Sequence, residues 1–156
     1  MLEIDIPGFG SVKLEYLVTD YTGTLSLDGK LLPQVREKLN VVALSLKVFV
    51  LTADEFGTVE EELKDVNCEV HIIKGKKMDV QKAEFVRKLG AEKAVALGNG
   101  TNDREMLKDS KLGIVVVGNE GCSVETLLAA DIQVANVADG LDLLLKPKRL
   151  RATLKF

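Results

Sequence analysis

The chain contains few aromatic residues and no overall excess of positive charge. Among its 156 residues there is no Trp, and aromatic residues make up 4%. A stacking surface for single-stranded nucleic acid requires several exposed aromatic rings, which this composition does not favour. The formal net charge of -3 gives no basic footprint for a duplex. We therefore expect no nucleic-acid partner.

Cysteine and histidine are also scarce, with two Cys and one His. Cys68 and His71 lie close together, but a zinc site usually needs four protein ligands, or three and a water. Cys122 belongs to no paired metal or redox spacing. We interpret both cysteines as small, buried residues on or near strands. Two cysteines without a secretory leader are typical of a cytoplasmic protein.

Long apolar runs are absent. The longest, such as residues 41–44, are far too short to span a bilayer, so the sequence predicts no membrane segment.

Acidic residues are missing from the end of the sequence, after Leu145. The basic residues there are Lys146, Lys148, Arg149, Arg151 and Lys155. We expect this basic tail, about 146–156, to pack on the body of the protein through Leu150, Leu154 and Phe156. Contact with phosphates or anionic lipid is the alternative.

The rest of the sequence alternates between short β-rich runs and longer helical patterns. The runs that suit strands buried on both faces of a sheet are 16–19, 48–52, 70–73, 94–97, 114–117 and, more weakly, 132–135. Helical patterns lie near 33–42, 59–66, 80–89, 102–107, 123–130 and 140–145. This alternation predicts one α/β domain over residues 1–156, with a doubly wound, Rossmann-like, mainly parallel sheet and helices on both faces.

Two hairpins are predicted outside this sheet. Short β-rich segments at 4–6 and 12–17 flank a turn with two glycines, which indicates an N-terminal hairpin leading into the first core strand. Asp28 and Gly29 form a turn dipeptide that favours a second, small hairpin just above Asp20.

In open α/β sheets, ligands bind beyond the carboxyl ends of the strands. The first core strand ends on Asp20, which is either a capping turn residue or a displayed nucleophile. Thr22, Gly23 and Thr24 follow, and such small residues let backbone N–H groups point at an anion near the carboxylate. The stretch therefore has the composition of a phosphate-binding turn.

Three further strand ends offer complementary groups. Thr52, with the backbone N–H of Ala53, suits a single phosphate oxygen. Lys82 lies near the start of the third helical pattern. A phosphoryl group and a carboxylate in one pocket repel each other, and the ammonium group of a lysine offsets that repulsion.

The fourth strand end is rich in glycine and oxygen ligands. Gly98 and Gly100 surround Asn99, and Asn102 and Asp103 follow. Oxygen ligands of this kind suit a hard cation such as Mg²⁺. A glycine-rich turn with a helix cap is the alternative interpretation for this segment alone.

Together, the four segments resemble the motifs of the haloacid-dehalogenase (HAD) superfamily of aspartate-nucleophile phosphotransferases. DYTGTL is similar to the Asp-Lys-Thr-Gly-Thr motif of P-type ATPases, and VLTAD is similar to the second motif of the superfamily. DVQKAEFVRKL is similar to the ATPase lysine segment, and GNGTND to Gly-Asp-Gly-x-Asn-Asp. The resemblance covers roughly residues 16–135 and is greatest for the phosphorylation domain of P-type ATPases and the small soluble proteins related to it.

The resemblance implies a phosphatase with an aspartyl-phosphate on Asp20. The catalytic residues would be Asp20, Thr22, Thr52 and Lys82, and the phosphate would be bound by Thr52, Ala53, Lys82 and Gly23. The cofactor would be Mg²⁺, and its ligands would be Asp20, the Thr22 carbonyl, Asn99 and Asp103.

This sequence departs from the superfamily pattern at two positions. Thr22 stands where most phosphatases have an acid/base aspartate, so we expect slow turnover, since a general acid/base typically contributes 10²–10⁴-fold. Asn99 replaces an aspartate ligand, so we expect weaker metal binding. Both departures support an alternative, a regulatory or binding module with weak or no catalysis.

The spacing of the motifs implies a capless core. The intervals between Asp20, Thr52 and Lys82 are too short for a large cap or an ATP-binding domain. An open site of this kind suits a small phosphorylated substrate or a phosphoprotein, or is covered in a homo-oligomer. A receiver-like signalling domain is disfavoured, because its phosphorylated aspartate lies on a later strand.

Overall fold

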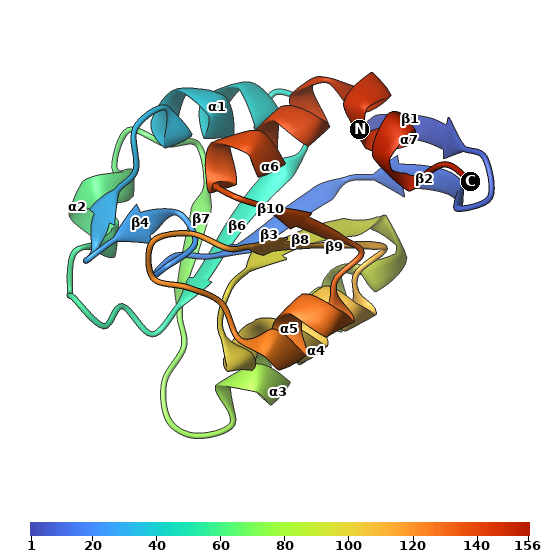
Figure 1. Cartoon of the computed structure of the whole chain (residues 1–156). Helices are drawn as coiled ribbons and strands as arrows, with labels where there is room; N and C mark the ends of the chain where they lie inside the picture. The colour runs from blue at the N-terminus through green and yellow to red at the C-terminus, as the bar shows by residue number, and fades with distance from the viewer.

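A six-stranded parallel sheet forms the centre of the molecule (Figure 1). The computed structural model describes residues 1–156. The strand order is β10-β9-β8-β3-β6-β7, and every pairing is parallel. The strands are β3 (Tyr16–Asp20), β6 (Lys47–Thr52), β7 (Glu69–Ile72), β8 (Ala94–Gly98), β9 (Leu112–Val116) and β10 (Ile132–Val134). All six predicted strands are confirmed, with ends shifted by at most two residues.

Helices cover both faces of the sheet, as predicted (Figure 1). On one face lie α1 (Val35–Val42), α2 (Val59–Leu63) and α6 (Val137–Leu145), and on the other lie α3 (Met78–Leu89), α4 (Arg104–Asp109) and α5 (Val124–Ala129). Alternate residues of a strand point to opposite faces, so Leu17 packs in one core and Val18 in the other. Because both faces are covered, all five residues of β8 and all five of β9 are buried.

The order of the strands reverses beside β3. The chain runs outward from β3 through β6 to β7, and then returns to the other side of β3 to form β8, β9 and β10. In doubly wound sheets, ligands bind at such a reversal, outside the carboxyl ends of the two strands. The ends that meet here are Asp20 of β3 and Gly98 of β8.

Both predicted hairpins are present. The N-terminal hairpin consists of β1 (Leu2–Ile6) and β2 (Gly10–Leu14), and ends two residues before β3. The second pairs β4 (Ser26–Leu27) with β5 (Lys30–Leu31). Its turn residues Asp28 and Gly29 have φ angles of 52° and 82°, the left-handed values that a two-residue hairpin turn requires.

The starts of α1 and α6 are shifted from the prediction for local reasons. Gln34 has φ 69°, so α1 begins at Val35 and not at Pro33. The side chain of Asn136 accepts a hydrogen bond from Asp139 N at 3.0 Å, and this cap starts α6 at Val137 rather than at residue 140. Short 3-10 turns, η1 (Ala91–Lys93) and η2 (Thr101–Asp103), precede β8 and α4.

The basic tail forms a helix, α7 (Pro147–Leu154), that docks beside β1 (Figure 1). Leu150 is fully buried and Leu154 is half-buried, as expected of a docked tail. The expectation for Phe156 was wrong, because its side chain is 93% exposed although its backbone N–H donates to Pro7 O at 3.0 Å.

None of the helices combines the length and apolar character needed to cross a bilayer.

Candidate active site

A cavity of about 260 Å³ opens at the carboxyl ends of β3, β6 and β8. It brings together six of the residues predicted for the site, namely Asp20, Thr22, Thr52, Ala53, Lys82 and Asn99. Met78, Gly100, Asn102, Glu55 and Glu120 complete its lining. Two predicted site residues, Gly23 and Asp103, lie next to the cavity but do not line it.

Lys82 connects three segments that are far apart in the sequence. Its side chain is 2% exposed, and its Nζ lies 3.0 Å from Asp20 Oδ1, 2.8 Å from Asp103 Oδ1 and 3.0 Å from Asn102 Oδ1. An ammonium group has three protons, so these three acceptors satisfy it completely. The apolar positions of α3 fix the helix on the sheet and direct Lys82 toward the end of β3.

Asp103 supports the site from behind the lysine. It is fully buried; one carboxylate oxygen accepts from Lys82, and the other accepts from the backbone N–H groups of Asn99 and Gly100, each at 3.0 Å. A Cβ at Gly98 would lie 2.5 Å from Asp103 Cβ, so only glycine allows this close approach. With both oxygens occupied, the geometry supports a role for Asp103 in positioning Lys82 and the glycine-rich turn.

Asp20 is 7% exposed and is held from two sides. Lys82 contacts Oδ1, and the hydroxyl of Thr24 lies 3.2 Å from Oδ2. The same hydroxyl lies 3.1 Å from Asn99 Oδ1, and its single proton serves only one of these acceptors at a time. The turn fits so tightly that a Cβ at Gly23, where φ is 79°, would lie 2.5 Å from Asn99 Nδ2.

The three buried ionisable groups carry one more negative than positive charge. Burial and the nearby charge of Asp103 raise the pKa of Asp20 to about 7, although Lys82 opposes the rise. Burial lowers the pKa of Lys82, but the charges of Asp103 and Asp20 outweigh it and hold the pKa above its ordinary value. Lys82 is therefore a permanent cation, and the fully ionised site has an excess charge of -1.

The two threonines of the site differ in their environments. Thr52 is 1% exposed, and its hydroxyl accepts from Asp54 N at 2.9 Å, which leaves its proton available to a ligand in the cavity. Thr22 is half-buried and lines the cavity beside Asp20.

The groups around the cavity fit a Mg²⁺ ion. The side chains of Asp20, Asn99 and Asn102 offer oxygen atoms, and no cysteine or histidine lines the cavity. Mg²⁺ prefers oxygen ligands and is usually bound by one or two carboxylates together with water molecules. The excess negative charge of the buried groups also attracts a cation.

Glu120 is a site residue that the sequence reasoning missed. It follows β9 in the loop between Gly118 and Gly121, and it lines the cavity with Asp20 and Thr22. The four strand ends considered above do not include the end of β9. The rule that ligands bind beyond the carboxyl ends of strands applies to β9 as well, and a glutamate between two glycines was the available signal.

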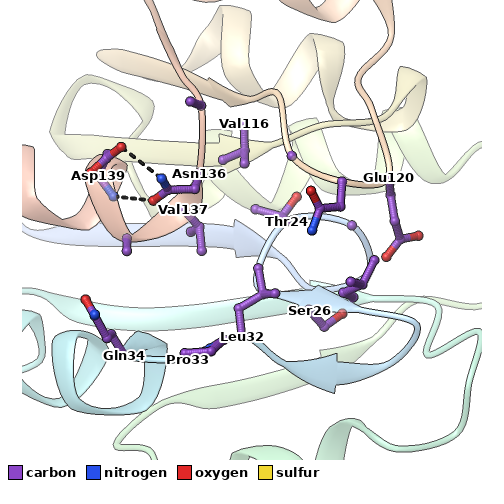
Figure 2. A pocket seen from close by; sticks show the side chains of 16 residues that line it. Thr24, Ser26, Leu32, Pro33, Gln34, Val116, Glu120, Asn136, Val137 and Asp139 are labelled. Atoms are coloured by element: carbon purple, nitrogen blue, oxygen red, sulfur yellow. Dashed lines mark hydrogen bonds between the residues drawn. The ribbon is translucent and has the colours of Figure 1, made fainter.

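A second cavity, of about 440 Å³, adjoins the first and shares Glu120 with it (Figure 2). It lies between the turn after β3, the loop after β9 and the start of α6. Thr24, Ser26, Gln34, Asn136 and Asp139 provide polar groups, and Leu32, Val116 and Val137 provide apolar surface. No lysine, arginine or histidine lines it.

No family model matches the sequence. An uncharacterised protein of Methanocaldococcus jannaschii is 50% identical over 62 residues, which are 40% of this chain and 67% of that protein. A soluble P-type ATPase-like phosphatase of the same organism is 25% identical over 143 residues. That alignment covers 87% of this chain and 51% of the phosphatase, so the chain spans about half the length of this relative.

Solved structures share the fold at low sequence identity. A 3-deoxy-D-manno-octulosonate 8-phosphate phosphatase from Moraxella catarrhalis has a TM-score of 0.70 and 20% identity, over 91% of this chain and 94% of that one. That structure is a complex with magnesium, phosphate and KDO. A zinc-transporting PIB-type ATPase has a TM-score of 0.62 and 22% identity, over 79% of this chain and 20% of that one.

A third structure carries the superfamily name. A protein from Legionella pneumophila described as a HAD superfamily (subfamily III A) hydrolase has a TM-score of 0.64 and 17% identity, over 90% of this chain and 87% of that one. The chain therefore has the fold of haloacid-dehalogenase hydrolases, and its sequence is similar to that of a soluble P-type ATPase-like phosphatase.

Proposed function

We propose that the chain is a Mg²⁺-dependent phosphatase that works through an aspartyl-phosphate on Asp20. The observation that carries this proposal is the buried contact between Asp20 and Lys82, 3.0 Å long, inside a cavity where the strand order reverses. Burying an ion pair is costly, and a surplus carboxylate beside it is more so. A site that retains this arrangement suits a reaction that needs both a nucleophile and a fixed cation.

In the proposed reaction, an Asp20 oxygen attacks the phosphorus atom of a phosphate monoester. The bond between phosphorus and the ester oxygen breaks, and its electron pair leaves with that oxygen, which takes a proton from solvent to give the alcohol. The Thr52 hydroxyl and the Ala53 N–H bind the phosphoryl oxygens, and Lys82 binds one by giving up its contact with Asn102. Together these groups stabilise the charge that the oxygens carry in the transition state. Water then hydrolyses the aspartyl-phosphate and regenerates Asp20.

The ligands proposed for Mg²⁺ are the carboxylate of Asp20, the carbonyl of Thr22 and the amide oxygen of Asn99. When bound, the ion neutralises charge on the transferring phosphoryl group. Asp103 is fully buried and does not line the cavity, so its proposed role is to hold Lys82 and the glycine-rich turn in place.

The second cavity suits the organic part of a small phosphorylated substrate. It adjoins the phosphoryl site at Glu120, and its polar groups are hydroxyls, amides and two carboxylates. A negatively charged leaving group would meet Glu120 and Asp139 and no cation. We therefore expect neutral, hydrogen-bonding phosphate esters to be better substrates than the phosphates of sugar acids.

The test is phosphate release from p-nitrophenyl phosphate and acetyl phosphate, with Mg²⁺ and after its removal by chelation. We expect slow release that requires the metal and falls by at least about 10³-fold in Asp20→Asn, because the amide is not a nucleophile. Asp5→Asn is the matched control, since Asp5 is exposed on the N-terminal hairpin. Full activity in Asp20→Asn would exclude the proposal.

A regulatory or binding module with weak or no catalysis is the second candidate. The observation that favours it is Asn99, whose amide is directed at Thr24 and Gly121 and adds no charge for a metal. Beryllofluoride with Mg²⁺ mimics the phosphoryl group on an aspartate and separates the candidates by thermal shift. Stabilisation that depends on Asp20 supports the phosphatase, and no response supports the second candidate.

A further inference from the structure

We propose that Glu120 is the catalytic base of the second step, accepting a proton from the water that attacks the aspartyl-phosphate. The inference rests on the proposed function and assigns to Glu120 the acid/base role for which Thr22 has no carboxylate. Its starting point is the lining of the 260 Å³ cavity, where Glu120 and Glu55 are the only carboxylates besides Asp20.

The loop that carries Glu120 is fixed to the site by Asn99. The amide nitrogen of Asn99 donates to Gly121 O at 3.1 Å, and Asn99 O accepts from Ser123 N at 2.8 Å. Within the loop, Gly121 N donates to Gly118 O at 2.9 Å. An aspartate at position 99 has no proton to donate to Gly121 O at neutral pH. The same residue that adds no charge for the metal therefore anchors the loop that brings a carboxylate to the cavity.

The side chain of Glu120 is also held from the opposite side. Its Oε2 accepts a hydrogen bond from Asp28 N at 3.3 Å, at the tip of the β4–β5 hairpin. Its Oε1 has no hydrogen-bond partner in the protein, so one oxygen is free to bind water. Glu55 is different, because its side chain makes no hydrogen bond or ion pair and its loop is not tied to the glycine-rich turn. Of the two carboxylates, only Glu120 is held both by its loop, through Asn99, and by its side chain, through Asp28.

In the proposed step, Glu120 accepts a proton from the attacking water. The water oxygen forms a bond to phosphorus while the bond between phosphorus and the Asp20 oxygen breaks, and the electron pair of that bond returns to the Asp20 carboxylate. The water proton passes to Glu120. Glu120 is exposed at the mouth of the cavity, so it releases the proton to solvent once phosphate has left.

The experiment separates formation of the aspartyl-phosphate from its hydrolysis. Wild-type protein and Glu120→Gln are mixed with ³²P-labelled acetyl phosphate and Mg²⁺, quenched with acid at intervals, and assayed for protein-bound label and free phosphate. In Glu120→Gln we expect label to bind at the wild-type rate, phosphate release to fall by about 10²-fold or more, and bound label to approach one per chain. Glu55→Gln is the matched control and should release phosphate at least about tenfold faster than Glu120→Gln.

A double variant tests whether Glu120 replaces the carboxylate missing at position 22. In Thr22→Asp/Glu120→Gln, the new aspartate should restore phosphate release to at least the wild-type rate and remove the accumulated label. Wild-type rates in Glu120→Gln, or loss of labelling as well as release, would overturn the inference. If wild-type protein itself takes up no label and releases no phosphate, the proposed function has failed instead, so the two failures are distinguishable.

Discussion

The two ends of the parallel sheet are held together by different interactions. At the carboxyl end, Asp20, Lys82 and Asp103 are in contact and at most 7% exposed. At the amino end, the ion pairs lie at the surface: Lys47 meets Glu69 at 2.8 Å and Lys93 meets Glu15 at 3.0 Å. There the core is closed by apolar side chains from the β1–β2 hairpin and from α7.

Apolar packing at the amino end therefore stabilises the fold, whereas the buried charges at the carboxyl end lower its stability. Apolar burial at the amino end is favourable by roughly 25 cal/mol per Å². Desolvating three ionised groups at the carboxyl end costs several kcal/mol for each, and is offset only while all the contacts are intact. We therefore expect substitutions at the two ends to affect stability and activity in different combinations.

The largest effect on stability is expected from Lys82→Met. This change leaves Asp20 and Asp103 buried without a cation, and removing one partner of a buried pair typically costs about 3–5 kcal/mol. Urea unfolding at pH 8 measures the change, and phosphatase activity should be lost as well. Lys47→Met is the control, because exposed pairs contribute about 0–1 kcal/mol. Equal stability of the two variants would show that the buried contacts are not maintained in solution.

Leu150→Ala should lower stability without changing catalysis. Leu150 is fully buried in α7, far in the fold from the candidate site, and such truncations cost about 2–5 kcal/mol. At a temperature where both proteins are folded, kcat with p-nitrophenyl phosphate should equal that of wild type. Leu44→Ala is the control, since Leu44 is 84% exposed and its truncation should change stability by less than about 0.5 kcal/mol. A large fall in kcat for Leu150→Ala would show that packing at the amino end also affects catalysis, which contradicts the prediction.

The fold was predictable because its signals are local. Each strand of the parallel sheet is buried on both faces and so appears as an aliphatic run, and Asp28–Gly29 specifies its hairpin within two residues. The errors lie where a single side chain or backbone angle decides the outcome. Asn136 starts α6 three residues early, and the left-handed Gln34 delays α1.

The site was predictable only in part, because its contacts connect distant segments. Asp20, Thr52 and Lys82 end or follow strands, and their positions could be inferred from the sheet alone. Two features depend on how the helices pack. Lys82 contacts Asp20, which is 62 positions away in the sequence, and Asp103 faces the lysine and the backbone instead of the cavity. Glu120 depends further on a loop whose position is set by the amide of Asn99.

The smallest expected effect is a dependence of stability on pH that only the carboxyl end produces. The pKa of Asp20 is raised to about 7 in the folded protein, and in the unfolded chain it is near 3.8. Between these values the folded state binds more protons, so stability decreases as pH rises through about 7. In chelator, we expect the free energy of unfolding to fall by about 1 kcal/mol between pH 6 and pH 8, which lowers Tm by about 2–4 °C.

Asp20→Asn isolates the contribution of the buried site, because its amide does not titrate and groups away from the site titrate alike in both proteins. The wild-type curve should fall relative to the variant, and Mg²⁺ at pH 8 should raise the wild-type Tm toward the variant's. Parallel curves would mean that Asp20 stays ionised across this range, with Lys82 offsetting both carboxylates. A difference that disappears when Mg²⁺ is added would show that the surplus charge at the carboxyl end is balanced by the cation that the proposed reaction requires.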